Sequence, residues 1–325
     1  MPVLALALVA LALLGGCAPR PGSAPAPAAG AWPGAGHPLA GRIWDVGAAR
    51  FLDAPALAGR LVTARFVLLG EKHDNPEHHR RQAELLRALV AAGRRPAVVF
   101  EMLAVDQEPQ LAAHLARAPR DAAGLGAAVG WEQRGWPPWA LYAPIAEVAL
   151  DAGLALVAGD LPRALQVAVR REGLGALEAG LRARTGLDRP LDPATRAAMA
   201  AALREAHCGY APEGALDRMV DVQRARDAHL AARLAAAPGD GAVLIAGAGH
   251  VRRDWGVPVY LARLAPAADV ASVALVEVDD RRLEPTGYAD RWGGTLPFDA
   301  LWFTPRVDDL DPCEKFRGAL ERWRR

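Results

Sequence analysis

Short apolar runs that alternate with helical patterns constrain this chain most. Runs that are apolar throughout, rather than alternating with polar residues, are typical of strands buried on both faces of a sheet. The connections between them are long enough for a helix, as parallel neighbouring strands require. The sequence therefore predicts an α/β fold, in which a mainly parallel central sheet is flanked by helices. The predicted strands are Phe66–Leu69, Val98–Phe100, Leu154–Ala158, Val243–Ala246 and Val273–Val278.

The sequence also places one helix start and one helical segment. Asn75-Pro76-Glu77 begins a helix, because Asn caps it, Pro suits the first turn and Glu faces the positive end of the helix dipole. From about residue 172 to 237 there is no strand pattern, and two amphipathic stretches follow one another, Asp192–His207 and Glu213–Ala235. We interpret this segment as a helical insertion that forms a smaller subdomain, suited to act as a lid or a pocket wall.

The N-terminus has the pattern of an export signal. Residues 1–16 are almost wholly apolar, are too few to span a bilayer, and end at Cys17. Leu14-Gly15-Gly16-Cys17 resembles a lipobox, where bacteria cleave the signal peptide and lipidate the cysteine, although no Lys or Arg precedes the apolar run. Residues 17–40 are typical of a flexible tether. We predict a signal peptide (1–16), a lipidated tether (17–40) and a folded domain (41–325).

Charge and cysteine content narrow the classes of function. The net charge is +1, and Lys and Arg are scattered, so nothing indicates a nucleic-acid-binding surface. Besides Cys17, where palmitate is an expected acyl chain, the cysteines are Cys208 and Cys313. They lack CxxC spacing, which excludes a zinc ribbon, and in an oxidising periplasm they can either pair or stay free. Ala18 after the lipidated cysteine favours the outer membrane of the cell envelope.

Polar residues directly follow three of the predicted strands. Glu71 and His73 follow the first, Glu101 follows the second, and His250 follows the fourth in Gly247-Ala248-Gly249-His250. The carboxyl ends of parallel strands meet at one edge of a sheet, so we expect these side chains to converge. Imidazoles and carboxylates suit a divalent metal such as zinc, with a carboxylate as general base, and they equally suit an anionic ligand. A polar network that only ties loops together is the third interpretation.

Six stretches taken in order resemble the ChaN family of haem-binding lipoproteins and cover most of residues 60–265. They are LLGEKHDNPEHH, VVFEM, GWPPWALYAPIAEVA, GDLPR, HCGY…MVDVQRARDAHLA and AGAGHVRRDWGVPVYL. That family lies in a superfamily with the TIKI proteases, TraB-type proteins and erythromycin-esterase-like enzymes. The resemblance implies haem binding and iron acquisition. Besides haem and the membrane, an outer-membrane haem receptor and a second copy of the chain are the partners considered.

If the bound cofactor is haem, tyrosines are the candidate iron ligands. Haem iron accepts a Tyr phenolate as an axial ligand, and a hard anionic oxygen favours ferric iron. Tyr142 is the first candidate, because Trp131, Trp136 and Trp139 lie close before it and flat aromatic surfaces suit a porphyrin. Tyr210, in the helical insertion, is the second candidate.

Haem propionates need cationic or hydrogen-bond-donating partners. The four strand-end residues would form the polar wall of the same haem site. His79, next to a candidate on a helix, is expected to point elsewhere and to be solvated. The candidates for propionate binding are His73, His78, Lys72, Arg163 and, further out, Arg252.

Two functional hypotheses therefore stand side by side. The first is a haem-binding surface lipoprotein without catalysis. The second is a metal-dependent hydrolase of protease or esterase type, with His73 and His250 as metal ligands and with Glu71 and Glu101 dividing the ligand and base roles. A catalytic zinc typically has three protein ligands and an open position. The chain offers only two well-placed histidines, one fewer than three nitrogen ligands would require. We therefore expect no strong zinc-dependent activity.

Overall fold

The computed structural model describes residues 32–211, 214–315 and 317–318. The predicted signal peptide, the lipidation site Cys17 and most of the predicted tether lie outside these ranges. Residues 32–40, the end of that tether, are folded. Leu39 is buried in the core, and the Gly41 N–H donates to the Phe303 carbonyl at 2.9 Å. The apolar Leu39 side chain thus ties this segment to the domain.

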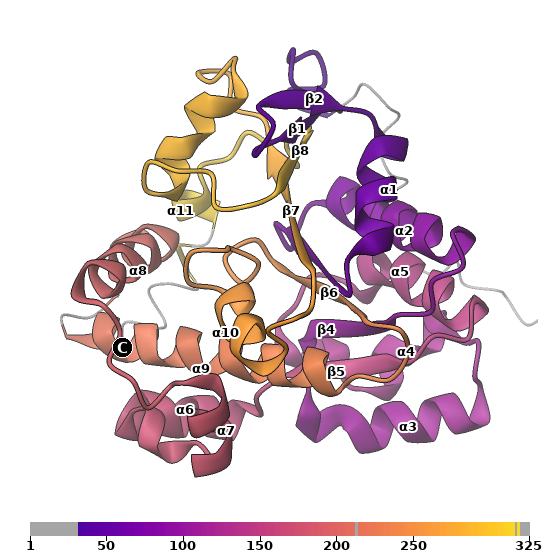
Figure 1. Ribbon diagram of the computed structural model, residues 1–325, viewed down its shortest axis with the longest axis vertical. Helices are drawn as coiled ribbons and strands as arrows, with labels where there is room; N and C mark the ends of the chain where they lie inside the picture. The colour runs from indigo at the N-terminus through magenta and orange to yellow at the C-terminus, as the bar shows by residue number, and fades with distance from the viewer. Residues whose placement is uncertain (1–31, 212–213, 316, 319–325) are drawn as a thin grey trace, which may run out of the picture.

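A sheet forms the centre of the described chain, with eight strands in the order β2-β1-β8-β7-β3-β6-β4-β5 (Figure 1). The six strands from β8 to β5 are parallel to one another, and β1 pairs antiparallel with β2 and β8. The predicted mainly parallel α/β fold is confirmed. The strands are β1 (Ile43–Asp45), β2 (Arg50–Leu52), β3 (Phe66–Glu71), β4 (Ala97–Ala104), β5 (Leu156–Asp160), β6 (Ala242–Gly247), β7 (Val270–Glu277) and β8 (Ala300–Thr304).

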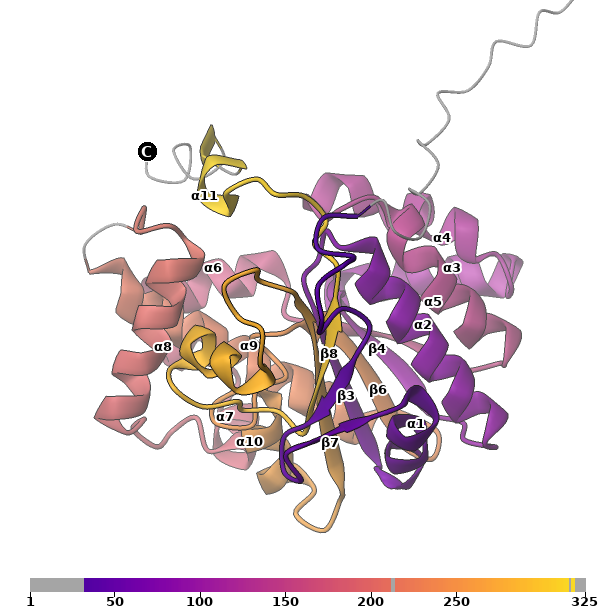
Figure 2. The same ribbon diagram turned by 90° about the horizontal axis from the view of Figure 1, so that it is seen from above.

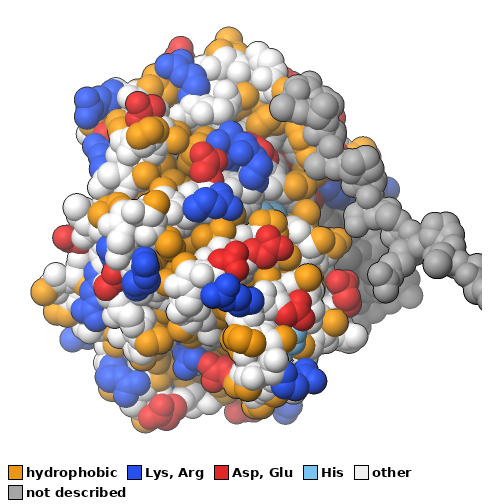
Figure 3. Space-filling model, turned by 90° about the vertical axis from the view of Figure 1, so that its right-hand side faces the viewer, with side chains coloured by type: hydrophobic (Ala, Val, Ile, Leu, Met, Phe, Trp, Pro, Cys, Tyr) orange, Lys and Arg blue, Asp and Glu red, His pale blue; other side chains and the backbone are white. Residues whose placement is uncertain are grey.

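Two layers of helices cover the sheet, one on each face (Figure 2). Each layer packs on its own hydrophobic core. Alternate residues of β3 point into the two cores: Val67 and Leu69 pack with one layer, and Phe66 and Leu68 with the other. Basic and acidic side chains are interspersed on the outer face drawn in Figure 3. None of the described helices is long and apolar enough to cross a bilayer. The first layer holds α1 (Ala54–Thr63), α2 (Pro76–Ala91), α3 (Glu108–Arg117), α4 (Ala122–Ala128) and α5 (Trp139–Asp151).

The second layer contains the predicted helical segment between β5 and β6. Helix α9 packs on the sheet and buries Ala225, Ala228 and Leu230; the two small alanine side chains allow close approach. Helix α8 lies outside α9 and forms the periphery of this segment. The helices on this side are α6 (Arg163–Glu172), α7 (Ala179–Thr185), α8 (Pro193–Ala206), α9 (Ala215–Ala236) and α10 (Val257–Leu264), and α11 (Pro312–Lys315) follows β8.

Candidate functional site

The structure brings Glu71, His73, Glu101 and His250 together at the carboxyl edge of the sheet, and we call these four residues the edge site. Glu71 ends β3, Glu101 lies in β4, and His250 follows the end of β6, which lies between those two strands. His250 Nε2 lies 3.1 Å from Glu101 Oε1, and His73 Nε2 lies 3.9 Å from Glu101 Oε2. The neighbouring positions of three parallel strands therefore create the cluster, as expected for an open α/β sheet.

Glu71 is a buried carboxylate surrounded by donors. Its Oε1 accepts hydrogen bonds from the Tyr142 hydroxyl at 2.8 Å and from His73 Nδ1 at 2.9 Å. His79 Nδ1 lies 3.0 Å from Oε2. Burial alone would raise the pKa of Glu71, but His79 and His73 together hold that pKa far below its usual range. Glu71 is therefore ionised in the folded protein.

Glu101 is the buried carboxylate at the centre of the site. It accepts hydrogen bonds from Arg226 at 2.7 Å and from the Gly247 N–H at 2.7 Å. Burial opposes ionisation, but His250 and then Arg226 lower the pKa of Glu101 well below its usual range. Arg226 also binds Asp160 at the end of β5, at 2.7 Å through Nη2 and 3.0 Å through Nε. These contacts compensate the buried charge.

His250 is held between two carboxylates. Its Nδ1 lies 2.5 Å from Asp227 Oδ1, and its Nε2 faces Glu101. Burial disfavours a charged ring, but Glu101 and then Asp227 raise the pKa of His250 to about 10. The ring is therefore an imidazolium at neutral pH, and both nitrogens donate to carboxylates.

His73 is the edge-site residue that reaches solvent, with 32% of its side chain exposed against 6% or less for the other three. Its ring lies 5.0 Å from that of Trp136, centroid to centroid. Burial opposes a charged ring, but Glu101 and then Glu71 outweigh it, and the pKa of His73 is raised above its usual value. A Cβ at Gly247 would come within 2.9 Å of His73 Nε2, so glycine is needed for this approach.

A protein-family model described as "Haem-binding uptake, Tiki superfamily, ChaN" matches residues 57–261, which include the whole edge site. The chain belongs to this family. Among solved structures, ChaN of Campylobacter jejuni, which is described as binding haem cofacially, is similar in fold. That structure has a TM-score of 0.63 and 19% identity, and the match covers 80% of this chain and 95% of that one.

Two further solved structures match this ChaN-family protein at lower similarity. The type III effector HopBA1 has a TM-score of 0.40 and 13% identity, with 77% of this chain and 91% of that one covered. A mutant of the erythromycin esterase EreC in its open conformation has a TM-score of 0.37 and 16% identity, with 81% and 82% covered. No curated protein matches the chain.

The zinc arrangement considered from the sequence is not assembled in this ChaN-family protein. Among the residues that the structure describes, no three His, Cys, Asp or Glu side chains are grouped so that they could hold a metal ion. The geometry gives the reason. Both nitrogens of His250 face carboxylates, and Glu71 and Glu101 are occupied by donors from the protein itself.

Tyr142 is not placed as an accessible iron ligand. Its side chain is 0% exposed, and its hydroxyl donates to Glu71. Its ring packs against His79 and Trp131, with centroids 4.1 and 4.9 Å away. Burial and then Glu71 raise the pKa of Tyr142 far above its usual range, which disfavours a phenolate. This reverses the order of the two tyrosines predicted from the sequence, although the identity of the iron ligand stays a prediction.

Tyr210 and Arg163 lie nearer the surface. Tyr210 is half-buried between α8 and α9, and its backbone N–H donates to the His207 carbonyl at 2.9 Å. Arg163 is exposed and is the first residue of α6, directly after β5. Both residues therefore remain candidates for contact with a ligand.

His78 is a structural residue, which corrects its prediction as a propionate partner. It is fully buried, its Nδ1 accepts the Lys72 N–H at 2.8 Å, and its Nε2 donates to Thr304 Oγ1 at 2.8 Å. Burial lowers the pKa of His78 to about 3, so the ring is neutral. Lys72 Nζ pairs with Asp74 and Glu277, both at 3.1 Å. Arg252, at 3% exposure, pairs with Asp254 at 2.6 Å and is likewise used internally.

Several residues of the site were missed by sequence reasoning. His79, predicted to be solvated, is 1% exposed and contacts Glu71, because this side of α2 faces the sheet. Gln223, Arg226 and Asp227 come from α9 and surround His250 and Glu101. Their i, i+3 and i+4 spacing places them on one helix face, which is the signal that would have found them.

Proposed function

We propose that this protein is a haem-binding lipoprotein of the bacterial envelope that serves haem or iron acquisition. The family match over residues 57–261 carries the proposal. The Cys208–Cys313 disulfide supports it, because disulfides persist in oxidising compartments outside the cytoplasm. Lipidation at Cys17 and an outer-membrane location belong to the same proposal.

Tyr210 fits an iron ligand best among the four tyrosines, all of which lie in the described ranges. Tyr142, Tyr260 and Tyr288 are 0%, 5% and 0% exposed, whereas Tyr210 is half-buried. Bound haem would supply ferric iron, for which a phenolate oxygen is a suitable ligand. Arg163 and the exposed part of His73 are the groups that would meet the propionates.

A haemin titration of the purified protein tests the proposal. Saturable binding with a shifted Soret band is expected, and metal analysis should find iron once haemin is added. A protein that leaves the spectrum of free haemin unchanged at micromolar concentration overturns haem binding. The lipid anchor is tested separately, by the mass of the mature N-terminus.

A hydrolase is the second candidate function, and the position of His73 favours it. A carboxylate holds Nδ1, the ring reaches solvent, and Nε2 lies 3.9 Å from Glu101, an arrangement suited to an oriented general acid–base group. Metal binding at His250 would first require displacing its carboxylate partners. If peptide or ester substrates are turned over, His73→Gln, which removes the proton-transferring ring, should slow the reaction by roughly 10²–10⁴-fold. The effect of a chelator separates the metal-dependent route, and no turnover by the wild type removes this candidate.

A further inference from the structure

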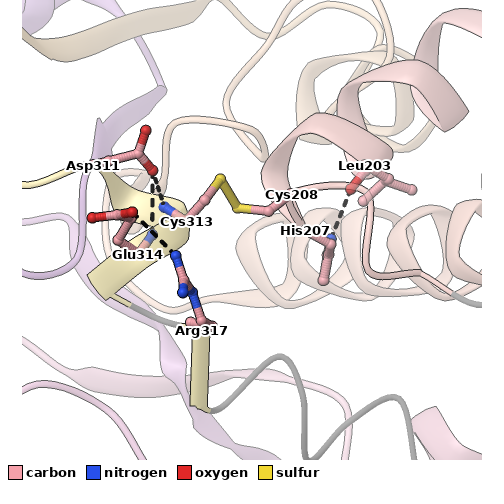
Figure 4. Close-up of a disulfide and its surroundings, with 7 residues drawn as sticks. All are labelled: Leu203, His207, Cys208, Asp311, Cys313, Glu314 and Arg317. Carbon is pink, nitrogen blue, oxygen red and sulfur yellow. Dashed lines mark hydrogen bonds and ion pairs between the residues drawn. A yellow bond between two sulfur atoms is a disulfide. The ribbon is translucent and has the colours of Figure 1, made fainter.

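The Cys208–Cys313 disulfide joins segments that are 105 residues apart in sequence (Figure 4). Cys208 lies in the α8–α9 turn, by which we mean residues 207–211. Cys313 lies in α11, within the C-terminal strap, by which we mean residues 305–315. Asp311 accepts hydrogen bonds from the backbone N–H groups of Cys313 and Glu314 at 2.7 and 3.2 Å. The strap end of the disulfide is thus fixed locally.

Helix α8 buries little surface of its own. Met199 is its one buried residue, and Arg196 forms ion pairs with Asp217 and Asp221 at 3.3 and 3.2 Å. After the helix, Cys208 has a φ of 55°, a left-handed conformation that non-glycine residues rarely adopt. Elements with few buried apolar contacts open readily. The disulfide is therefore a covalent attachment at the carboxyl end of a helix that buries little surface.

The C-terminal strap is fastened in turn to the loop that carries His73. Lys315 Nζ lies 2.8 Å from Asp74 Oδ2, and Asn75 Nδ2 donates to the Pro305 carbonyl at 3.1 Å. Asp74 and Asn75 directly follow His73 in the chain. The disulfide and these contacts thus form a continuous link from the α8–α9 turn, through the strap, to the edge site.

We infer that the Cys208–Cys313 disulfide positions Tyr210 for ligand binding. Tyr210 lies two residues beyond Cys208, so the disulfide holds the backbone from which the Tyr210 side chain projects at a fixed place relative to the strap. Without this bond the turn must be ordered when the ligand binds, which weakens affinity. The inference rests on the proposed function, in which Tyr210 binds the iron. Cys208 and Cys313 are positioning residues only.

The test compares the oxidised full chain with the Cys208→Ser/Cys313→Ser variant. Haemin binding to the variant should be roughly ten-fold weaker, the equivalent of ordering one or two side chains. Amide hydrogen exchange in residues 203–211 should be faster in the variant, whether or not haemin is present. Tyr210→Phe should weaken binding in the oxidised wild type but add little in the double Ser variant, because the two effects are coupled.

Reduction of the folded wild type gives the same comparison if the variant does not fold. Dithiothreitol transfers two electrons and two protons to the disulfide, yielding two thiols, and is itself oxidised to a cyclic disulfide; it is removed without air before haemin is added, because thiols bind haem iron. Wild type carried through the same steps without reductant is the control, and where the double Ser variant folds, the treatment should change neither its affinity nor its exchange. Unchanged affinity and exchange in a haemin-binding protein would overturn the inference and leave the proposed function intact. If the wild type does not bind haemin, the proposed function fails, and exchange alone then shows whether the disulfide holds the turn.

Discussion

Replacing Tyr142 with Phe removes one hydroxyl group from a fully buried part of the edge site. That hydroxyl donates to Glu71 Oε1 at 2.8 Å, and the Tyr142 side chain is 0% exposed. Because Glu71 is ionised, the lost hydrogen bond is charge-assisted and contributes about 1.5–3 kcal/mol to the free energy of unfolding. Glu71 keeps His73 at 2.9 Å and His79 at 3.0 Å as partners. The expected loss therefore lies near the lower end, at about 1.5–2 kcal/mol.

Urea denaturation followed by circular dichroism measures this loss as a lower midpoint with an unchanged slope. The haemin spectrum of Tyr142→Phe should match that of the wild type. Tyr210→Phe is the matched variant: its free energy of unfolding should change by less than about 0.5 kcal/mol, but its Soret and charge-transfer bands should move.

The reasoning has two independent points of failure. If Tyr142→Phe is as stable as the wild type, its hydrogen bond to Glu71 contributes nothing. If Tyr142→Phe loses the charge-transfer band while Tyr210→Phe keeps it, the iron ligand is Tyr142 and the argument from burial is wrong. Tyrosine ligation itself is wrong if both variants keep the wild-type spectrum.

Other measurements test the remaining arguments. Reduction of the Cys208–Cys313 disulfide, which spans 105 residues, should lower the free energy of unfolding by about 2–5 kcal/mol in urea; an unchanged midpoint would contradict this. Glu101→Gln should cost about 3 kcal/mol by the same assay, because Arg226 and His250 each lose one of two buried carboxylate partners. The pKa of His250 is raised from 6.5 to about 10, so its stabilising effect is complete below pH 6.5 and is lost as the pH rises toward 10. His250→Gln should lack this component of the pH dependence. Cys17→Ser should release the protein from membranes or leave an uncleaved precursor, and an unmodified, uncleaved wild-type N-terminus in mass spectrometry would contradict lipidation.

The sequence by itself determined the parallel centre of the sheet and the meeting of its chemical groups. Uniformly apolar runs identified five of the six mutually parallel strands, but not β8, and Asn75 marked the start of α2, where its side chain accepts the Glu77 N–H at 2.9 Å. Glu71 and Glu101 could be placed together because strand ends are a local feature and parallel strands share an edge. The short β1 and β2, with three residues each, have no such signal, since a run of that length shows no periodicity.

The tertiary structure decided what each polar group does. It showed that Asp227 and Arg226 reach the edge site from α9, that Tyr142 is buried against Glu71, and that Cys208 reaches Cys313. Sequence patterns carry secondary structure, because it depends on neighbours along the chain. Hydrogen-bond partners, burial and hence the ionisation of a side chain depend instead on residues brought close from far along the chain, here 71 positions apart for Tyr142 and Glu71.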